Sequence, residues 1–189
     1  MELPNGGGTI GEDSIVSVRV EDFVPIYNTL PESGQGGDPL RVELTNVKEA
    51  VYARHIGAPE EDKVVVYLVP NQAQTGKYDM VIAGPGGVKA PADLSYMLAE
   101  MIPNPNDAIV RPPTALALTS IDLEKLDVSG VTKMEGMFYG SDELTELDLT
   151  GWDTSSVTDM ESMFSSCENL KELDVSGFDT SQAADMVAM

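Results

Sequence analysis

Apolar residues in the last third of the chain recur with a fixed step of 26 residues. The step relates six sets of positions: Leu118, Leu144 and Leu170; Ile121, Leu147 and Leu173; Leu123, Leu149 and Val175; Leu126, Trp152 and Phe178; Val131, Val157 and Ala183; and Met134, Met160 and Met186. A period of about 20–29 residues with L-x-x-L-x-L spacing is typical of solenoids whose coils bury their apolar faces against one another. The pattern predicts about three coils over residues 118–189.

Within each coil the apolar spacing changes. Residues 144–149 alternate between apolar and polar, which predicts a short strand. Residues 160–164 carry apolar side chains at i, i+3 and i+4, which predicts one face of a short helix, and its methionines are expected in the core. Thr158, followed three residues later by Glu161, forms a capping box that would open this helix. Each coil is therefore predicted to be strand, turn, short helix and turn.

The repeated segment, residues 144–181, resembles a known family. The residues that carry the resemblance are Asp153, Thr154, Ser155, Val157, Thr158, Met160, Met163, Phe164 and Cys167. They follow the D-T-S-x-V-T-x-M-x-x-M-F and C-x-x-L pattern of the BspA-type leucine-rich repeat, found in bacterial surface proteins, mycoplasma lipoproteins and some phage-encoded proteins. The first repeat has Tyr139, Gly140 and Ser141 around the place of the cysteine, and the last repeat departs from the pattern after Ser181. The resemblance implies a surface for adhesion or protein binding.

The first part of the chain has the pattern of β-strands. Val16, Val18 and Val20 alternate with polar residues, and residues 64–69 form an apolar run that Pro70 ends. We therefore predict an α+β fold with three parts. Residues 1–88 form a β-rich anchoring domain, a sandwich or barrel, with a long loop at residues 31–38. Residues 89–117 hold the solenoid's N-terminal cap, in which 92–101 copies the repeat helix, and a Pro-rich insertion. Residues 118–189 form the leucine-rich-repeat solenoid.

Charge narrows the range of partners. The chain has 32 acidic and 11 basic residues and a formal net charge of −21, most of it in residues 91–189. Such a field repels nucleic acid and anionic lipid, so a protein partner or cations are expected. No apolar run reaches about 18 residues, so we expect no membrane insertion. The first residues lack the pattern of a signal peptide, so we expect either a leader that was removed or no export by that route.

Acidic residues form two expected columns along the solenoid. Asp122, Asp148 and Asp174 share one position of the strand face, and Asp127, Asp153 and Asp179 share a position in the next turn. Either column could act as a calcium ladder. The alternative for the turn column, which we favour, is an Asx turn. For the strand face we favour a solvated acidic surface, and the alternative is binding of a cation or a partner. The candidate partner-binding residues of this face are Glu146, Asp148, Glu172 and Asp174.

Features that suggest catalysis are weak. His55 is the single histidine, without an accompanying nucleophile motif, and is expected to be structural. Residues 84–87, Gly-Pro-Gly-Gly, lack the G-K-[ST] ending of a phosphate loop and are expected to form a turn. The single cysteine, Cys167, excludes an intramolecular disulfide. We therefore expect no enzyme activity and no cofactor, with calcium as the one possible addition.

The last coil is expected to carry an apolar face that no following coil covers. Its residues are Leu173, Val175, Phe178, Met186 and Met189. We expect another chain to cover this face, either a second copy or a different subunit.

Two functions fit these features. In the first, the chain is a non-catalytic structural component that displays an acidic surface on a larger assembly, such as a decoration or fibre protein of a phage virion. In the second, it is the mature fragment of a secreted bacterial cell-surface adhesin that binds host or bacterial proteins. A self-assembling multimer without a signal peptide favours the first, and an encoded signal peptide favours the second.

Overall fold

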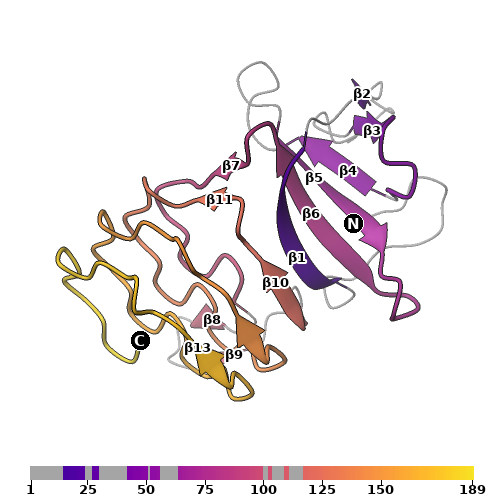
Figure 1. The fold of residues 1–189 in the computed structure, drawn as a ribbon. Helices are drawn as coiled ribbons and strands as arrows, with labels where there is room; N and C mark the ends of the chain where they lie inside the picture. The colour runs from indigo at the N-terminus through magenta and orange to yellow at the C-terminus, as the bar shows by residue number, and fades with distance from the viewer. Residues whose placement is uncertain are drawn as a thin grey trace.

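The fold joins a twisted sheet to a stack of coils (Figure 1). A computed structural model of the chain describes residues 15–23, 27–29, 42–50, 52–55, 64–99, 102–103, 109–110 and 117–189. The predicted loop at 31–38 and most of the predicted Pro-rich insertion lie outside these residues. Within the described residues, no helix has the length and hydrophobicity to cross a membrane.

The sheet has five strands, in the order β10-β1-β6-β5-β4. These are β1 (Ile15–Asp22), β4 (Tyr52–His55), β5 (Val65–Pro70), β6 (Tyr78–Gly84) and β10 (Ser120–Asp122). Strand β1 is parallel to both of its neighbours, β10 and β6, and β5 is antiparallel to β6 and β4. Two antiparallel pairs lie outside this sheet: β2 (Tyr27–Thr29) with β3 (Val42–Leu44), and β8 (Ile102–Pro103) with β9 (Ile109–Val110). The described strands thus form one mixed sheet with small pairs, and the predicted sandwich or barrel is wrong.

Alternation along β1 and β5 gives the sheet two buried faces. Val18, Val20 and Leu68 belong to the large core that continues into the coils. Tyr67 and Val81 belong to a smaller core on the opposite face, together with the loop after β3. The strands predicted from alternation at residues 16–20 and from the apolar run at 64–69 are therefore confirmed.

The 26-residue repeats stack in register. We use the name coil stack for residues 117–189 together with residues 88–99. Strand β12 (Glu146–Leu147) is parallel to β13 (Glu172–Leu173). On another side of the coils, parallel bridges run from Asp93 to Lys133, from Lys133 to Asp159 and from Asp159 to Asp185. Equivalent residues of successive coils therefore lie side by side, as the repeat predicts.

The predicted α+β fold with a leucine-rich-repeat solenoid is wrong, because none of the described residues lies in a helix. Where a helix was predicted, the amide of Met160 donates to the carbonyl of Asp185 at 3.0 Å, and the amide of Ser162 to that of Val187 at 2.8 Å. In an α-helix these amides would bond to carbonyls four residues earlier. Ser162 also has a φ of 55°, in the left-handed region that an α-helix excludes. Hydrogen bonds between coils thus replace hydrogen bonds within a helix.

The predicted capping box is wrong for the same reason. The hydroxyl of Thr158 donates to the carbonyl of Thr132 on the preceding coil at 3.1 Å. The amide of Glu161 donates to the carboxylate of Asp159 at 3.2 Å. Both groups therefore stabilise turns and contacts between coils rather than the first turn of a helix.

The coil stack begins with a coil built from two separate segments. Strand β1 pairs with β10, so that Val18 lies beside Ile121. Strand β7 (Val88–Lys89) pairs in parallel with β11 (Leu126–Asp127). Residues 92–99 then follow the turns of the next coil, with Leu94 and Leu98 buried. These residues lie at the N-terminal end of the stack, where the sequence predicts a cap, although as turns rather than as a helix. The predicted domain boundaries stay predictions.

The core of the coil stack is made of stacked apolar columns. Met134, Met137, Met160 and Met163 are fully buried, which confirms that these methionines pack in the core. Phe138, also fully buried, stacks on Phe164 of the next coil with 5.7 Å between ring centroids. The same core includes buried residues of β1, so the sheet and the coils share one apolar interior.

Candidate functional site

The acidic residues predicted for the strand face lie on the surface of the coil stack. Glu146, Asp148, Glu172 and Asp174 are all exposed, and the β12–β13 register places Glu146 beside Glu172. Neighbouring strands are about 4.8 Å apart, so these like charges repel one another unless a cation lies near. The structure therefore brings the four residues together as one acidic surface that favours a positively charged partner.

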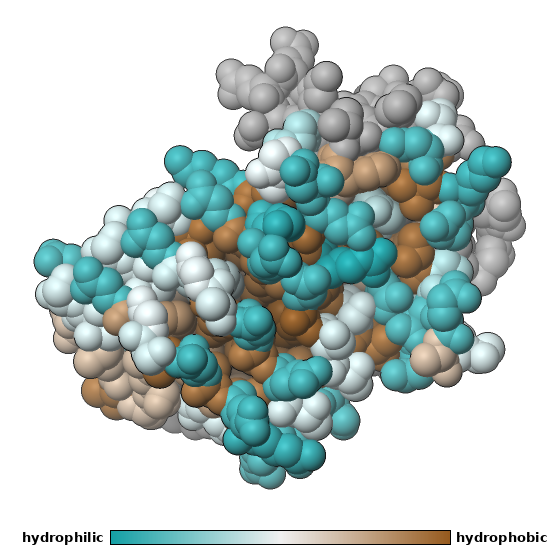
Figure 2. All heavy atoms as spheres, in the orientation of Figure 1, coloured by the Kyte–Doolittle hydropathy of each residue, from teal (hydrophilic) through white to brown (hydrophobic). Residues whose placement is uncertain are grey.

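Two hollows lie where this surface meets the sheet. The seam hollow, about 300 Å³, is lined by Val20, Glu21, Asp22, Phe23, Asp122, Glu124 and Lys125. The coil hollow, about 460 Å³, is lined by Ile121, Asp122, Glu124, Asp148, Thr150 and Trp152. The hollows share Asp122 and Glu124, and we call the two together the acidic groove. Over the middle of the molecule, where sheet and coils meet, Figure 2 shows apolar surface bordered by hydrophilic residues.

Backbone hydrogen bonds hold the groove aspartates in place. Asp122 Oδ1 accepts the amide of Glu124 at 3.1 Å, and Asp148 Oδ1 accepts the amide of Thr150 at 2.9 Å. Each aspartate thus forms an Asx turn with one carboxylate oxygen, while a carboxylate has lone pairs for several donors. The groove therefore presents carboxylates whose positions are set before any ligand arrives.

The neighbouring turn column makes the same contact. The oxygens of Asp153 and Asp179 accept the amides of Ser155 and Ser181 at 3.1 and 2.8 Å. Asp127 accepts the amide two residues later at 3.0 Å in the same way. The prediction that these aspartates form Asx turns is confirmed.

Hydrogen bonding keeps Asp148 ionised. The side chain and the amide of Thr150 lower the pKa of Asp148, and the nearby charge of Asp174 opposes them without reversing the direction. Hydrogen bonds from Ser176 lower the pKa of Asp174 in the same manner. Both carboxylates therefore carry a full negative charge at neutral and mildly acidic pH.

The floor of the coil hollow is apolar. Trp152 and Ile121 line it and are only 7% and 9% exposed. Trp152 is the single tryptophan of the chain. An apolar floor below a carboxylate rim suits lysine and arginine, whose aliphatic stems cover apolar surface while the charged head stays at the rim.

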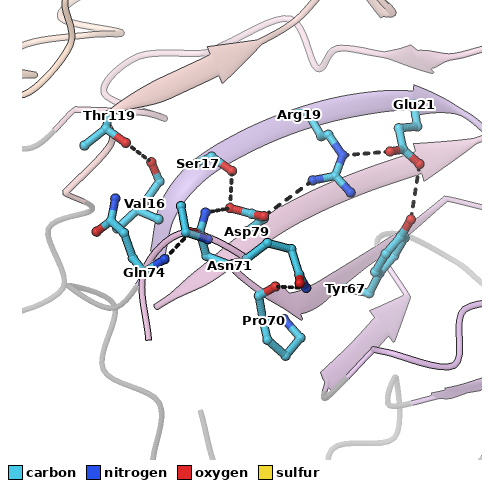
Figure 3. Close-up of polar contacts among 12 residues, drawn as sticks. Val16, Ser17, Arg19, Glu21, Tyr67, Pro70, Asn71, Gln74, Asp79 and Thr119 are labelled. Atoms are coloured by element: carbon cyan, nitrogen blue, oxygen red, sulfur yellow. Dashed lines mark hydrogen bonds and ion pairs between the residues drawn. The ribbon is translucent and has the colours of Figure 1, made fainter. Parts of the chain in front are cut away.

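On the sheet side, Glu21 belongs to a polar network that the sequence pattern did not indicate (Figure 3). Its carboxylate accepts the Arg19 Nε–H at 2.7 Å and the Tyr67 hydroxyl at 3.2 Å. Burial, and next the charge of Glu21, raise the pKa of Tyr67, which therefore stays protonated and remains a donor. Arg19 offsets the charge of Glu21, and Lys125 pairs with Glu124 at 2.6 Å, so Asp22 and Asp122 provide most of the net charge of the seam hollow.

The predicted metal ligands do not form a compact group. Asp122, Asp148 and Asp174 lie on successive coils, each with one oxygen in an Asx turn. In the part of the chain that the structure describes, no cluster of three or more His, Cys, Asp or Glu side chains could hold a metal ion.

Two of the other sequence candidates, the turn at residues 84–87 and Cys167, make structural contacts. The amide of Gly86 donates to Asp22 Oδ1 at 2.6 Å, so this turn binds a carboxylate of the chain itself, and the predicted turn at residues 84–87 is confirmed. His55 lies in β4, but its side chain is outside the described residues. Cys167 donates its thiol to the carbonyl of Phe138 at 3.1 Å, which joins two coils.

The predicted apolar end of the coil stack is partly open. Leu173, Val175, Phe178 and Met189 are half-buried. Met186 is 46% exposed, whereas Met160, at the same position one coil earlier, is fully buried. The prediction that another chain covers this face stays a prediction.

A second acidic cluster lies on another side of the stack and leads to a prediction. The charge of Asp185, then burial, then the charges of Glu135 and Asp159 raise the pKa of Glu161 above its ordinary value of 4.5. The folded chain thus holds this proton more tightly than the unfolded chain, so ionised Glu161 destabilises the fold at neutral pH. We expect Glu161→Gln to raise the melting temperature by about 1–2 °C at pH 7.

The gain should disappear when Glu161→Gln and the unmodified chain are compared well below pH 4.5, where Glu161 is protonated in both the folded and the unfolded chain. Glu143→Gln is the control, because it removes the same charge from another exposed position. Melting curves followed by circular dichroism measure the effect. Equal gains from the two variants at pH 7 would contradict the local repulsion at Glu161.

Part of the chain matches a known protein family. Residues 114–189 match a family described as "Mycoplasma protein of unknown function, DUF285". The match covers the repeated coils, including β10, and leaves the strands β1 to β9 outside. Neither a curated protein nor a solved structure matches the chain significantly.

Proposed function

We propose that the chain is a non-catalytic interaction protein that binds a basic segment of another protein in the acidic groove. The observation that carries the proposal is the coil hollow itself, in which carboxylates held by backbone hydrogen bonds form the rim and apolar side chains form the floor. Carboxylates alone would attract any cation, whereas the floor of Trp152 and Ile121 favours a cation that carries an aliphatic stem.

The charge of the whole chain supports a protein partner. A net charge of −21 repels phosphate backbones and steers basic surfaces towards the chain. The shared rim of the two hollows, Asp122 and Glu124, gives the groove room for more than one basic side chain. A short segment with several lysines or arginines fits these features.

The kind of assembly or surface protein in which this binding takes place stays a prediction. A component of a phage virion and a secreted bacterial adhesin would both use such a surface. The match of residues 114–189 to a family described from Mycoplasma is compatible with a bacterial surface protein, and its description states no function. The proposal therefore concerns what the two settings share, which is binding of a protein through the acidic face of the coils.

Binding of a simple peptide tests the proposal. The probe is an octapeptide of alternating arginine and serine, and its control contains citrulline, which has the same shape without the charge. Fluorescence of Trp152, the single tryptophan, reports occupation of the coil hollow. We expect the arginine peptide to change the fluorescence saturably, the citrulline peptide to have no effect, and added salt to weaken binding.

A matched pair of variants distinguishes binding in the acidic groove from attraction by the net charge of the chain. Asp148→Asn should weaken binding by about 2–5-fold, the range expected for one exposed ion pair. The amide of asparagine can still accept the turn hydrogen bond, so the coil should keep its shape. Asp179→Asn removes the same charge from the same kind of Asx turn outside the groove and should leave the affinity almost unchanged. Equal weakening by the two variants would contradict the proposal.

A further inference from the structure

The seam hollow already contains a positively charged side chain of this chain. Lys125 Nζ lies 2.6 Å from Glu124 Oε1. Hydrogen bonding and charge from Glu124, followed by the charges of Asp22 and Asp122, raise the pKa of Lys125. The lysine ammonium therefore lies within the field of three carboxylates, and it shows where a cation is stable in the first half of the groove.

The repeat places a glycine, rather than a lysine, between two residues that line the coil hollow, Thr150 and Trp152. The 26-residue step carries Asp122 to Asp148 and Lys125 to Gly151. A Cβ atom built on Gly151 would have no neighbouring atom within 4 Å, so the space beside this backbone is open. The coil hollow thus repeats the aspartate of the seam hollow, and the chain supplies no side chain at the position equivalent to Lys125.

The coil hollow also differs from the seam hollow in size and floor. Its volume is about 460 Å³, against about 300 Å³ for the seam hollow. The step that carries Lys125 to Gly151 carries Leu126 to Trp152, which lines the larger hollow. A guanidinium is larger and flatter than an ammonium, pairs with carboxylates through several donors, and packs well on an indole.

We infer that the coil hollow is the binding place of one arginine side chain from the partner, which occupies the position that Lys125 occupies in the seam hollow. The aliphatic stem lies on Trp152, and the guanidinium donates to Asp148 and Asp122. This inference rests on the proposed function and names the partner's anchor residue. It also assigns a role to Lys125, which offsets part of the negative charge of the seam hollow from within, whereas no lysine or arginine is among the described residues that line the coil hollow.

Filling the open position from within the chain tests the inference. Gly151→Lys should place an ammonium in the coil hollow and weaken binding of the arginine octapeptide at least tenfold. Gly151 has a φ of 84°, so Gly151→Ala is the control that carries the same backbone strain without the charge. Gly177→Lys adds the same charge one coil further on, at a position with open space. We expect both controls to bind within about threefold of the unmodified chain.

Trp152→Leu provides a second test that needs no change of backbone. An octapeptide with lysine in place of arginine is compared by calorimetry. The unmodified chain should prefer the arginine peptide at least threefold, and Trp152→Leu, which copies the residue of the preceding coil, should remove the preference while lysine binding persists. If circular dichroism shows that the two Gly151 variants do not fold, the arginine preference of Trp152→Leu tests the inference in their place.

The outcomes separate the inference from the proposed function. If Gly151→Lys binds as tightly as Gly151→Ala, or if Trp152→Leu keeps the arginine preference, the inference is overturned while binding to the groove stands. If Gly177→Lys weakens binding as much as Gly151→Lys, only the general charge matters and the inference is overturned. If neither peptide binds the unmodified chain, the proposed function and the inference both fail.

Discussion

Phe138→Ala is expected to lower the free energy of unfolding by about 3–5 kcal/mol, because it leaves a cavity in the centre of the coil stack. Phe138 is fully buried, its ring stacks on Phe164, and its ring centroid lies 6.5 Å from that of Trp152. Each of these contacts joins one coil to the next. The loss should therefore lower the melting temperature of the whole chain by about 10 °C.

Phe164 provides the matched control, since it has the same position one coil later but is only half-buried. Phe164→Ala removes less buried surface and should cost clearly less than Phe138→Ala. Urea unfolding followed by the fluorescence of Trp152 measures both. Equal losses for the two variants would show that the stacking of coils does not bury Phe138 as the structure indicates.

Gly87→Ala is expected to have the second largest effect, about 2–5 kcal/mol, because it combines backbone strain with a backbone clash. Gly87 has a φ of 94°, and a Cβ atom there would lie 2.6 Å from the carbonyl oxygen of Lys125. The same carbonyl accepts the amide of Val88 at 3.0 Å, which begins the β7–β11 pairing. A methyl group at this point would push apart the segments that join the sheet to the coils.

Variants of two other glycines separate the effect of backbone strain from the effect of the clash. Gly86 has a φ of 78° with open space for a Cβ, so Gly86→Ala should show the strain alone, about 1 kcal/mol. Gly177 has open space without a positive φ, so Gly177→Ala should be almost neutral. Thermal unfolding ranks the three variants. If Gly87→Ala costs no more than Gly86→Ala, the close approach to Lys125 is not maintained in solution.

The Gly87 variant also bears on the groove. Lys125 contributes its carbonyl to the sheet–coil joint and its ammonium to the seam hollow. A displaced backbone at this residue would move the internal cation relative to Asp22 and Asp122. Structure and binding are therefore coupled at one residue, and the groove exists only because the sheet and the coils are held in register.

Part of the candidate site follows from the repeat. The 26-residue step places Asp122, Asp148 and Asp174 in one column. The parallel pairing of successive coils places this column and the acidic residues beside it on the same surface. The Asx turns follow from an aspartate whose side chain accepts the amide two residues later, at Glu124 for Asp122 and at Thr150 for Asp148, which is a local property. What the repeat could not indicate is the contribution of Asp22, because β1 is separated from β10 by about a hundred residues and no spacing links the two strands.

The sequence by itself determined the step of the coils, many of the residues that face the core and the Asx turns of Asp127, Asp153 and Asp179. These properties depend on residue type and spacing, which act over a few residues or repeat at a fixed period. Only the tertiary structure decided that residues 160–164 form turns. An apolar pattern at i, i+3 and i+4 fits a helix as well as it fits these turns. Which of the two forms depends on whether amides such as that of Met160 donate within the segment or to the next coil.

The insertion of β1 beside β10 was also decided only by the tertiary structure. The alternating pattern of β1 would allow it to pair with any strand that has an exposed edge. Its pairing with β10 depends on the edge that the first coil leaves exposed. That pairing closes the end of the coil stack, sets Asp22 beside Asp122 and Lys125, and so creates the seam hollow. The charge of the groove is therefore present in the sequence, whereas its shape arises from contacts between distant segments.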